Sequence, residues 1–130
     1  MSKPYRPLGL DVELRVMING VVAIGPIQAT LLGEIHNMGS IAAAQRRLGS
    51  PYAHIWKLVA AMNDKFSPPL VTVSRGGAQG GGARLTPLGH QVLDAFRKLE
   101  RLVRVEGRSE LQVISRSARK HRATEVVARR

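Results

Sequence analysis

The chain contains no cysteine among its 130 residues. This absence excludes disulfides, cysteine-ligated zinc, iron–sulfur clusters and thiol catalysis. Aromatic residues make up only 4% of the chain, so aliphatic side chains must fill the core. No apolar run approaches the roughly 20 residues that span a bilayer, and residues 1–7 lack the apolar segment of a signal peptide. We therefore expect a soluble, cytoplasmic protein with no membrane partner.

Acidic residues are also scarce. Nine Asp and Glu stand against 20 Lys and Arg, which gives a formal net charge of +11. Residues 101–130 contain nine of the bases and three of the acids, a net +6. Such an excess favours binding to polyanions, with nucleic acid ahead of an anionic membrane. The alternative is that the charge only keeps the protein in solution.

Features of an enzyme are missing as well. The four histidines, at positions 36, 54, 90 and 121, do not show metal-ligand spacing. The carboxylates are scattered, and no pair suggests acid–base catalysis. We expect no enzymatic activity, no metal site and no cofactor, and we expect His36 and His90 to be surface or boundary residues.

The start of the chain predicts a β-hairpin. Residues 1–9 form a proline-rich lead, which we expect to be flexible. Apolar and charged residues alternate from Leu10 to Arg15, the period of a half-buried strand. Asn19-Gly20 is a strong signal for a two-residue hairpin turn, and residues 21–24 are the expected return strand.

Three helices are predicted next. Gly25-Pro26 opens the first, which ends at Met38-Gly39. Ser40 caps the second, residues 41–48, and Gly49 ends it in a left-handed conformation. Ser50 caps the third, residues 51–66, with Pro51 in its first turn. The buried stripe of the third helix comprises Ile55, Leu58, Val59 and Met62, with Trp56 packing beside it.

A second hairpin and a long helix follow. Residues 70–73 and 83–85 are the predicted strands, and five glycines occur in the intervening residues 76–82. Thr86 caps a helix with Pro87 at its first position. Its apolar stripe continues to Val103, and the pattern fades at Gly107. A further short element is possible around Leu111, Val113 and Ile114, within a basic tail at 107–130 that we expect to be partly disordered.

This order of elements predicts an α+β fold, mainly α: a winged helix-turn-helix with an N-terminal β-hairpin, a glycine-rich wing and a long C-terminal helix. The DNA-binding domain spans residues 10–106. In such folds the second helix of the motif enters the major groove with its N-terminal residues at the base edges. Helix 51–66 takes that role here, and the wing at 75–85 contacts the backbone or the minor groove. The candidate DNA-binding residues are Ser40, Ser50, Tyr52, His54, Lys57, Arg75 and Arg84.

Alternatives stay open for each candidate. Ser40 either holds a phosphate at a helix N-terminus or only caps that helix. Tyr52 either contacts a base or packs, and His54 is either a base contact or merely exposed. The glycines let the backbone approach the sugar-phosphate chain while Arg75 and Arg84 supply charge, or the hairpin makes no contact at all.

The chain resembles the N-terminal winged helix-turn-helix domain of ModE-type molybdate-responsive regulators, a group related to LysR-type DNA-binding domains. The resemblance runs from about Leu10 to Leu99. It rests on the segments 39–44 and 48–49, on Tyr52, Trp56, 62–63 and 70–71, and most specifically on Gly76-Gly77 and the run from Gly80 to Gly89.

The resemblance implies a homodimer that binds a near-palindromic double-stranded site. Helix 86–106 would pair, with help from the 10–24 hairpin. The apolar stripe agrees, and the candidate interface comprises Phe96, Leu99, Leu102 and Val103. Packing within one chain is the alternative explanation of this stripe.

The same resemblance predicts a difference in sensing. Family members sense molybdate through C-terminal β-barrel domains, which we expect this chain to lack, so molybdate is not expected to bind it. The leading prediction is therefore a stand-alone DNA-binding transcriptional regulator. The alternatives are a non-specific architectural DNA-binding protein and a protein-interaction module that has lost DNA binding.

Overall fold

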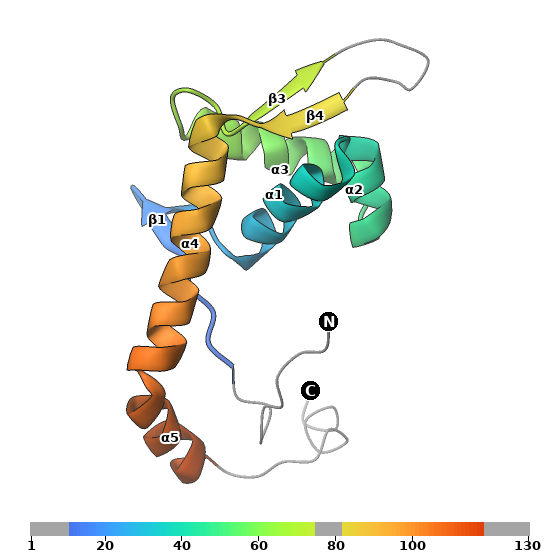
Figure 1. Ribbon diagram of the computed structural model, residues 1–130. Helices are drawn as coiled ribbons and strands as arrows, with labels where there is room; N and C mark the ends of the chain where they lie inside the picture. Colours follow the sequence, from blue (N-terminus) through green and yellow to red (C-terminus); the bar gives the residue numbers. More distant parts are fainter. Residues whose placement is uncertain (1–10, 75–81, 119–130) are drawn as a thin grey trace. The chain divides into compact units, whose positions relative to one another are not determined.

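The computed structural model describes residues 11–74 and 82–118, and it is mainly helical with two small antiparallel sheets. This agrees with the predicted α+β class. In these residues the elements are β1 (Val16–Ile18), β2 (Val21–Ile24), α1 (Pro26–Met38), α2 (Ile41–Leu48), α3 (Tyr52–Asp64), β3 (Val71–Ser74), β4 (Gly82–Leu85), α4 (Pro87–Glu106) and α5 (Arg108–Ser117) (Figure 1). The described residues divide into two compact units, one within residues 13–99 and the other comprising residues 11–12 and 100–118.

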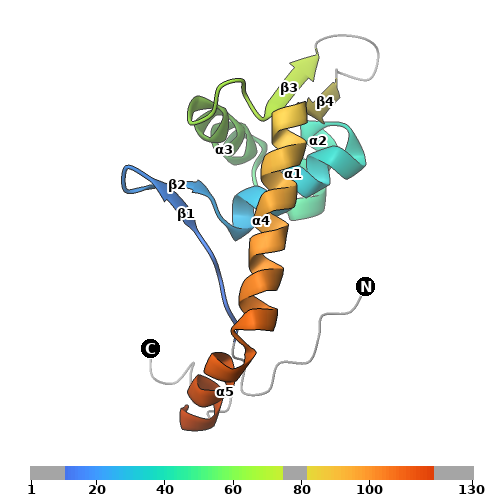
Figure 2. The same ribbon diagram turned by 60° about the vertical axis from the view of Figure 1, so that its left-hand side comes forward.

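β1 and β2 form an antiparallel hairpin around Asn19-Gly20 (Figure 2). Asn19 and Gly20 both have positive φ, 51° and 78°, as a two-residue hairpin turn requires. The turn and the return strand are therefore confirmed.

The first strand lies later in the sequence than predicted: residues 11–15 are not a strand, and β1 begins at Val16. The reason is the register, in which Val16 pairs with Ile24, the last residue of β2. Because Pro26 begins a helix immediately afterwards, no residues remain to pair with those upstream of Val16. The apolar alternation still describes burial, since Leu14 is half-buried between exposed neighbours.

The capping residues explain why α1 and α2 begin and end where they do. The Gln28 side chain accepts a hydrogen bond from the Gly25 backbone N–H at 2.9 Å. Ser40 Oγ accepts from Ala43 N–H at 2.9 Å, so the predicted cap is present. Gly39 and Gly49 each end a helix with φ of 73°, a conformation that favours glycine.

The predicted bounds of the third helix, 51–66, were wrong, because α3 runs from Tyr52 to Asp64. Ser50 was expected to cap it but makes no side-chain cap. Pro51 occupies the N-cap position with ψ of 142°, so the backbone becomes helical only after it. The Pro51 carbonyl then accepts the N–H of Ile55 at 3.2 Å.

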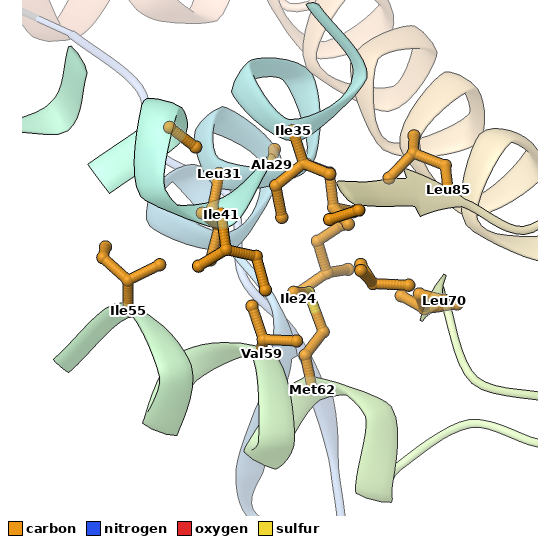
Figure 3. Close-up of a cluster of buried hydrophobic side chains, with 14 of the residues drawn as sticks. Ile24, Ala29, Leu31, Ile35, Ile41, Ile55, Val59, Met62, Leu70 and Leu85 are labelled. Atoms are coloured by element: carbon orange, nitrogen blue, oxygen red, sulfur yellow. The ribbon is translucent and has the colours of Figure 1, made fainter. Parts of the chain in front are cut away.

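The core of the unit 13–99 is an aliphatic cluster between α1, α2, α3 and the two β-pairs (Figure 3). α3 contributes Ile55, Val59 and Met62, all nearly inaccessible to solvent, as its predicted stripe requires. Leu58 and Trp56 pack against the cluster while remaining partly exposed. The low aromatic content therefore leaves one fully buried ring in the described residues, that of Phe96.

β3 pairs antiparallel with β4, in the register Val71–Leu85 to Ser74–Gly82. The predicted strand 70–73 is shifted by one residue, and the predicted return strand 83–85 lies within β4. Arg75 and most of the glycine-rich segment lie outside the described residues. The predicted cap of α4 is confirmed, since Thr86 Oγ1 accepts from Gly89 N–H at 2.9 Å.

In the other unit, α4 ends at Glu106 and α5 follows as a ten-residue helix. α5 includes the positions around Leu111 at which a further element was predicted. Arg104 lies 4.0 Å from the carboxylate of Asp11. Within residues 11–74 and 82–118, no helix has both the length and the apolar content to cross a membrane.

Candidate nucleic-acid interface

The corner between α2 and α3 is fixed by side chains as well as by Gly49. Gln45 Nε2 donates to the Ser50 carbonyl at 2.7 Å, which ties the end of α2 to the start of α3. Arg47 on α2 forms an ion pair with Glu34 on α1 at 3.4 Å. Sequence reasoning gave Gln45 no role, because its partner is a backbone oxygen five residues away, which no motif specifies.

α3 has one buried and one exposed side. Ile55 and Val59 face the core, and by the helical repeat Lys57 lies on the opposite face. The exposed residues of its first turns are Tyr52, Ala53, His54 and Lys57. Three of these four are predicted DNA-binding residues, so the structure leaves them accessible on one helix.

The predicted α3 residues spread over the flanks of the helix. The Tyr52 ring meets the Trp56 ring edge-on, with centroids 6.0 Å apart, while Tyr52 stays 48% exposed. On another side, His54 and Ser50 line a cleft of about 320 Å³ together with Ile27 of α1. Tyr52 is thus oriented by an aromatic neighbour, and His54 borders a largely apolar hollow.

The β3–β4 pair is attached at the other end of α2, at the turn between α1 and α2. Ala83 N–H donates to the Gly39 carbonyl at 2.9 Å, which joins β4 to the turn between α1 and α2. Along β4, Ala83 and Leu85 are buried and Arg84 between them is exposed. The strand therefore holds Arg84 on its exposed side. Arg75, the other arginine predicted for the wing, lies outside the described residues.

Several cationic side chains of α2, α3 and β4 have no partner among the described residues. The side chains of Lys57, Arg46 and Arg84 form no hydrogen bond or ion pair within the part of the chain that the structure describes. Ser40 Oγ, by contrast, accepts the Ala43 N–H bond, so its capping role is directly visible. These elements therefore carry positive charge that no carboxylate in residues 11–74 and 82–118 neutralises.

The predicted interface residues on α4 separate into two kinds. Phe96 is 1% exposed and belongs to the core of its own chain, so its assignment to a dimer interface was wrong. A buried ring that packs against the chain's own helices has no surface for a second copy. Leu99 and Leu102, at 43% and 45% exposure, remain accessible, and Val103 is half-buried.

The geometry is that of two helices joined by a tight turn, of which the second has exposed polar side chains in its first turns, with a β-pair that carries the exposed Arg84. Comparison with known proteins gives two kinds of relative, molybdenum-pterin-binding proteins and ModE proteins. The chain is 42% identical over 77 residues to the molybdenum-pterin-binding protein MopB of Rhodobacter capsulatus, covering 59% of this chain and 28% of MopB. It is 35% identical over 92 residues to the transcriptional regulator ModE of Haemophilus influenzae, covering 70% of this chain and 36% of ModE.

A third relative is the molybdenum transport protein ModE of Azotobacter vinelandii, 35% identical over 78 residues, 60% of this chain and 29% of that protein. The chain is thus related to molybdenum-pterin-binding proteins and ModE regulators over much of its length. It spans only about a third of the length of the relatives it matches. No protein-family model matches the chain.

Proposed function

We propose that this protein is a DNA-binding transcriptional regulator with a winged helix-turn-helix domain, in which α2 and α3 form the motif and the β3–β4 pair belongs to the wing. α3 would enter the major groove and Arg84 would contact the backbone or the minor-groove edge. The observation that carries the proposal is the exposed N-terminal half of α3. Tyr52, His54 and Lys57 are accessible there, while Ile55 and Val59 hold the helix to the core.

Charge and relatedness support the same function. A formal charge of +11 favours a polyanion, and the Lys57 and Arg84 side chains of α3 and β4 have no partner among the described residues. Relatives named as transcriptional regulators cover 55–70% of this chain. Relatives are also named for molybdenum transport and molybdenum-pterin binding, so the regulated genes are proposed to concern molybdenum.

Within this proposal each predicted residue has a role. Tyr52 and His54 contact base edges from two flanks of α3, and Lys57 reaches a guanine edge or a phosphate. Ser40 caps α2 and Ser50 lies two residues before α3, close to helix N-termini where backbone N–H groups favour phosphate. Arg75 and Arg84 supply charge on the two sides of the wing.

The proposal is tested by in-vitro selection of duplex DNA from a random pool, at about 150 mM salt so that non-specific electrostatic binding is reduced. An enriched inverted repeat is expected, bound roughly 10³-fold or more tightly than random sequence. Tyr52→Ala and His54→Ala should then change the preference among sequences. Arg84→Ala should weaken binding to all sequences alike.

A matched control is Lys98→Ala, which removes an exposed cation of α4 away from the motif. It should leave sequence preference unchanged. If Tyr52→Ala and His54→Ala keep both affinity and preference, α3 is not the recognition helix.

An architectural DNA-binding function is the second candidate. It is favoured by the net charge of +6 within residues 101–130, outside the proposed motif. The same selection distinguishes the two functions, because a non-specific binder retains the pool without enriching any sequence.

A further inference from the structure

A second cleft, of about 620 Å³, lies at the base of the β3–β4 pair. It is bordered by the last turn of α1, by both strands and by the first turn of α4. Its polar lining consists of His36 from α1, His90 from α4, Arg84 from β4, and the hydroxyl groups of Thr72 and Ser74 from β3. Three elements thus bring nitrogen-bearing side chains to one hollow.

The two histidines are neighbours in space although 54 positions apart in the sequence. Their ring centroids are 5.0 Å apart and the rings are nearly perpendicular, at 88°. Both residues are exposed, and neither imidazole side chain forms a hydrogen bond or an ion pair within the described residues. Their ring nitrogens therefore remain available to a ligand.

The charge of the lining selects the kind of ligand. No Asp or Glu lines the cleft among the described residues, and Glu34, the acid nearest to His36 in the sequence, is paired with Arg47. A metal ion would need a third ligand, and no group of three His, Cys, Asp or Glu side chains exists in residues 11–74 and 82–118. Arg84 also repels a cation, whereas a guanidinium fork matches a tetrahedral oxyanion.

We propose that this cleft binds a phosphate group, with Arg84 as the charged ligand and His36 and His90 as two further N–H donors. The Thr72 hydroxyl adds a donor on the strand beside Arg84. The phosphate belongs either to the DNA backbone or to a free phosphate ion, since the chemistry of recognition is the same. The DNA alternative rests on the proposed function, and the free-ion alternative does not.

The first test is a titration of the full chain, labelled with ¹⁵N, with inorganic phosphate at constant ionic strength maintained with sodium chloride. Saturable shifts are expected for the His36 and His90 side chains and for the backbone amides that line the cleft. The double variant His36→Gln/His90→Gln should lose the saturable shifts of the backbone amides. Lys98→Gln should keep them, because Lys98 is an exposed α4 cation that does not line the cleft.

The second test measures duplex DNA binding in buffer without phosphate. If the backbone supplies the phosphate, His36→Gln/His90→Gln should weaken binding on the order of tenfold, as for lost hydrogen bonds to a charged group. Sequence preference should not change, because backbone contacts carry no base information. Thermal unfolding of the variant confirms its fold, and His90→Gln alone replaces it if the double variant unfolds early.

The results separate the alternatives. A saturable phosphate response lost in the double variant, with unchanged DNA affinity, identifies a free-ion site. Weaker DNA binding without a saturable phosphate response identifies a backbone contact. If neither property differs from the unsubstituted protein, the phosphate site is refuted, whereas the proposed regulatory function stands as long as α3 variants alter DNA binding.

Discussion

At the scale of single residues, Asn63 and Thr86 hold the segment that joins α3 to β3. Asn63 Oδ1 accepts the backbone N–H groups of Leu70 and Val71 at 3.0 and 3.1 Å, and its Nδ2 donates to the Val71 carbonyl at 3.0 Å. Thr86 Oγ1 donates to the Pro69 carbonyl at 2.7 Å. These side chains supply hydrogen bonds that the short strand itself cannot supply.

Asn63→Ala should therefore lower the free energy of unfolding by about 2–3 kcal/mol, because three part-buried backbone groups lose their partner. Urea denaturation followed by circular dichroism measures the change. Asn37→Ala is the matched control: Asn37 lies in the last turns of α1, is exposed, and should change stability by less than about 0.5 kcal/mol. Equal effects of the two substitutions would show that the Asn63 bonds contribute nothing net.

At the scale of elements, α4 approaches the chain before β3 so closely that only glycine fits at one position. A Cβ atom built on Gly89 would overlap the backbone carbonyl of Leu70, which also accepts the Thr86 N–H. Backbone atoms cannot move aside as a flexible side chain can. The first turn of α4 is thereby positioned against residues 69–71, and β4 with it.

Gly89→Ala should destabilise the protein by about 1–3 kcal/mol although alanine is the better helix former, because the overlap displaces α4. Gly33 provides an opposite control, since it lies in α1 with nothing within 4 Å of an added Cβ. Gly33→Ala should stabilise by about 0.5–1 kcal/mol. Chemical denaturation measures the free energy of unfolding of both variants. A stabilising Gly89→Ala would contradict the close contact between α4 and Leu70.

The elements that could be predicted from the sequence are those specified by local signals. Asn19-Gly20, the Ser40 and Thr86 caps and the terminating Gly49 act through their immediate neighbours, and the structure contains each of them. The strand at 10–15 was wrong because alternation reports burial and not whether a partner strand exists.

The candidate site was less predictable, because many of its contacts join residues that are distant in the sequence. Exposed α3 residues followed from the helical period of its buried stripe. The contact of His36 with His90 joins two helices through the tertiary fold, and Gln45 binds a backbone oxygen, so neither has a local pattern. Phe96 was also not predictable from a local pattern. An apolar stripe does not reveal which of its residues pack inside their own chain, and Phe96 is one that does.

At the scale of the whole molecule, exposed apolar side chains on α4 require an explanation. Leu99, Leu102 and Val105 are each more than 40% exposed, and consecutive members of this series are three residues apart on one helix. Such spacing places them along the same side of the helix. Isolated exposed apolar residues are common, but a row on a helix is typical of pairing between helices.

Pairing of two copies through this row would explain both the exposed leucines and the near-palindromic site proposed for the DNA. Two recognition helices then meet successive major grooves about 34–36 Å apart. Leu99→Gln/Leu102→Gln should convert a dimer to a monomer in analytical ultracentrifugation. The same variant should lose affinity for an inverted repeat while binding a single half-site as the unsubstituted protein does.

Arg104→Gln serves as the control for this last prediction, because Arg104 is an exposed cation that the helical repeat places on a different side of α4 from Leu99 and Leu102. It should remain dimeric, with only the small loss of DNA affinity that one cation explains. If the leucine variant stays dimeric, the pairing surface lies elsewhere. If the unsubstituted protein is a monomer that still selects an inverted repeat, two copies must assemble on the DNA, and the exposed row on α4 then has no role in solution.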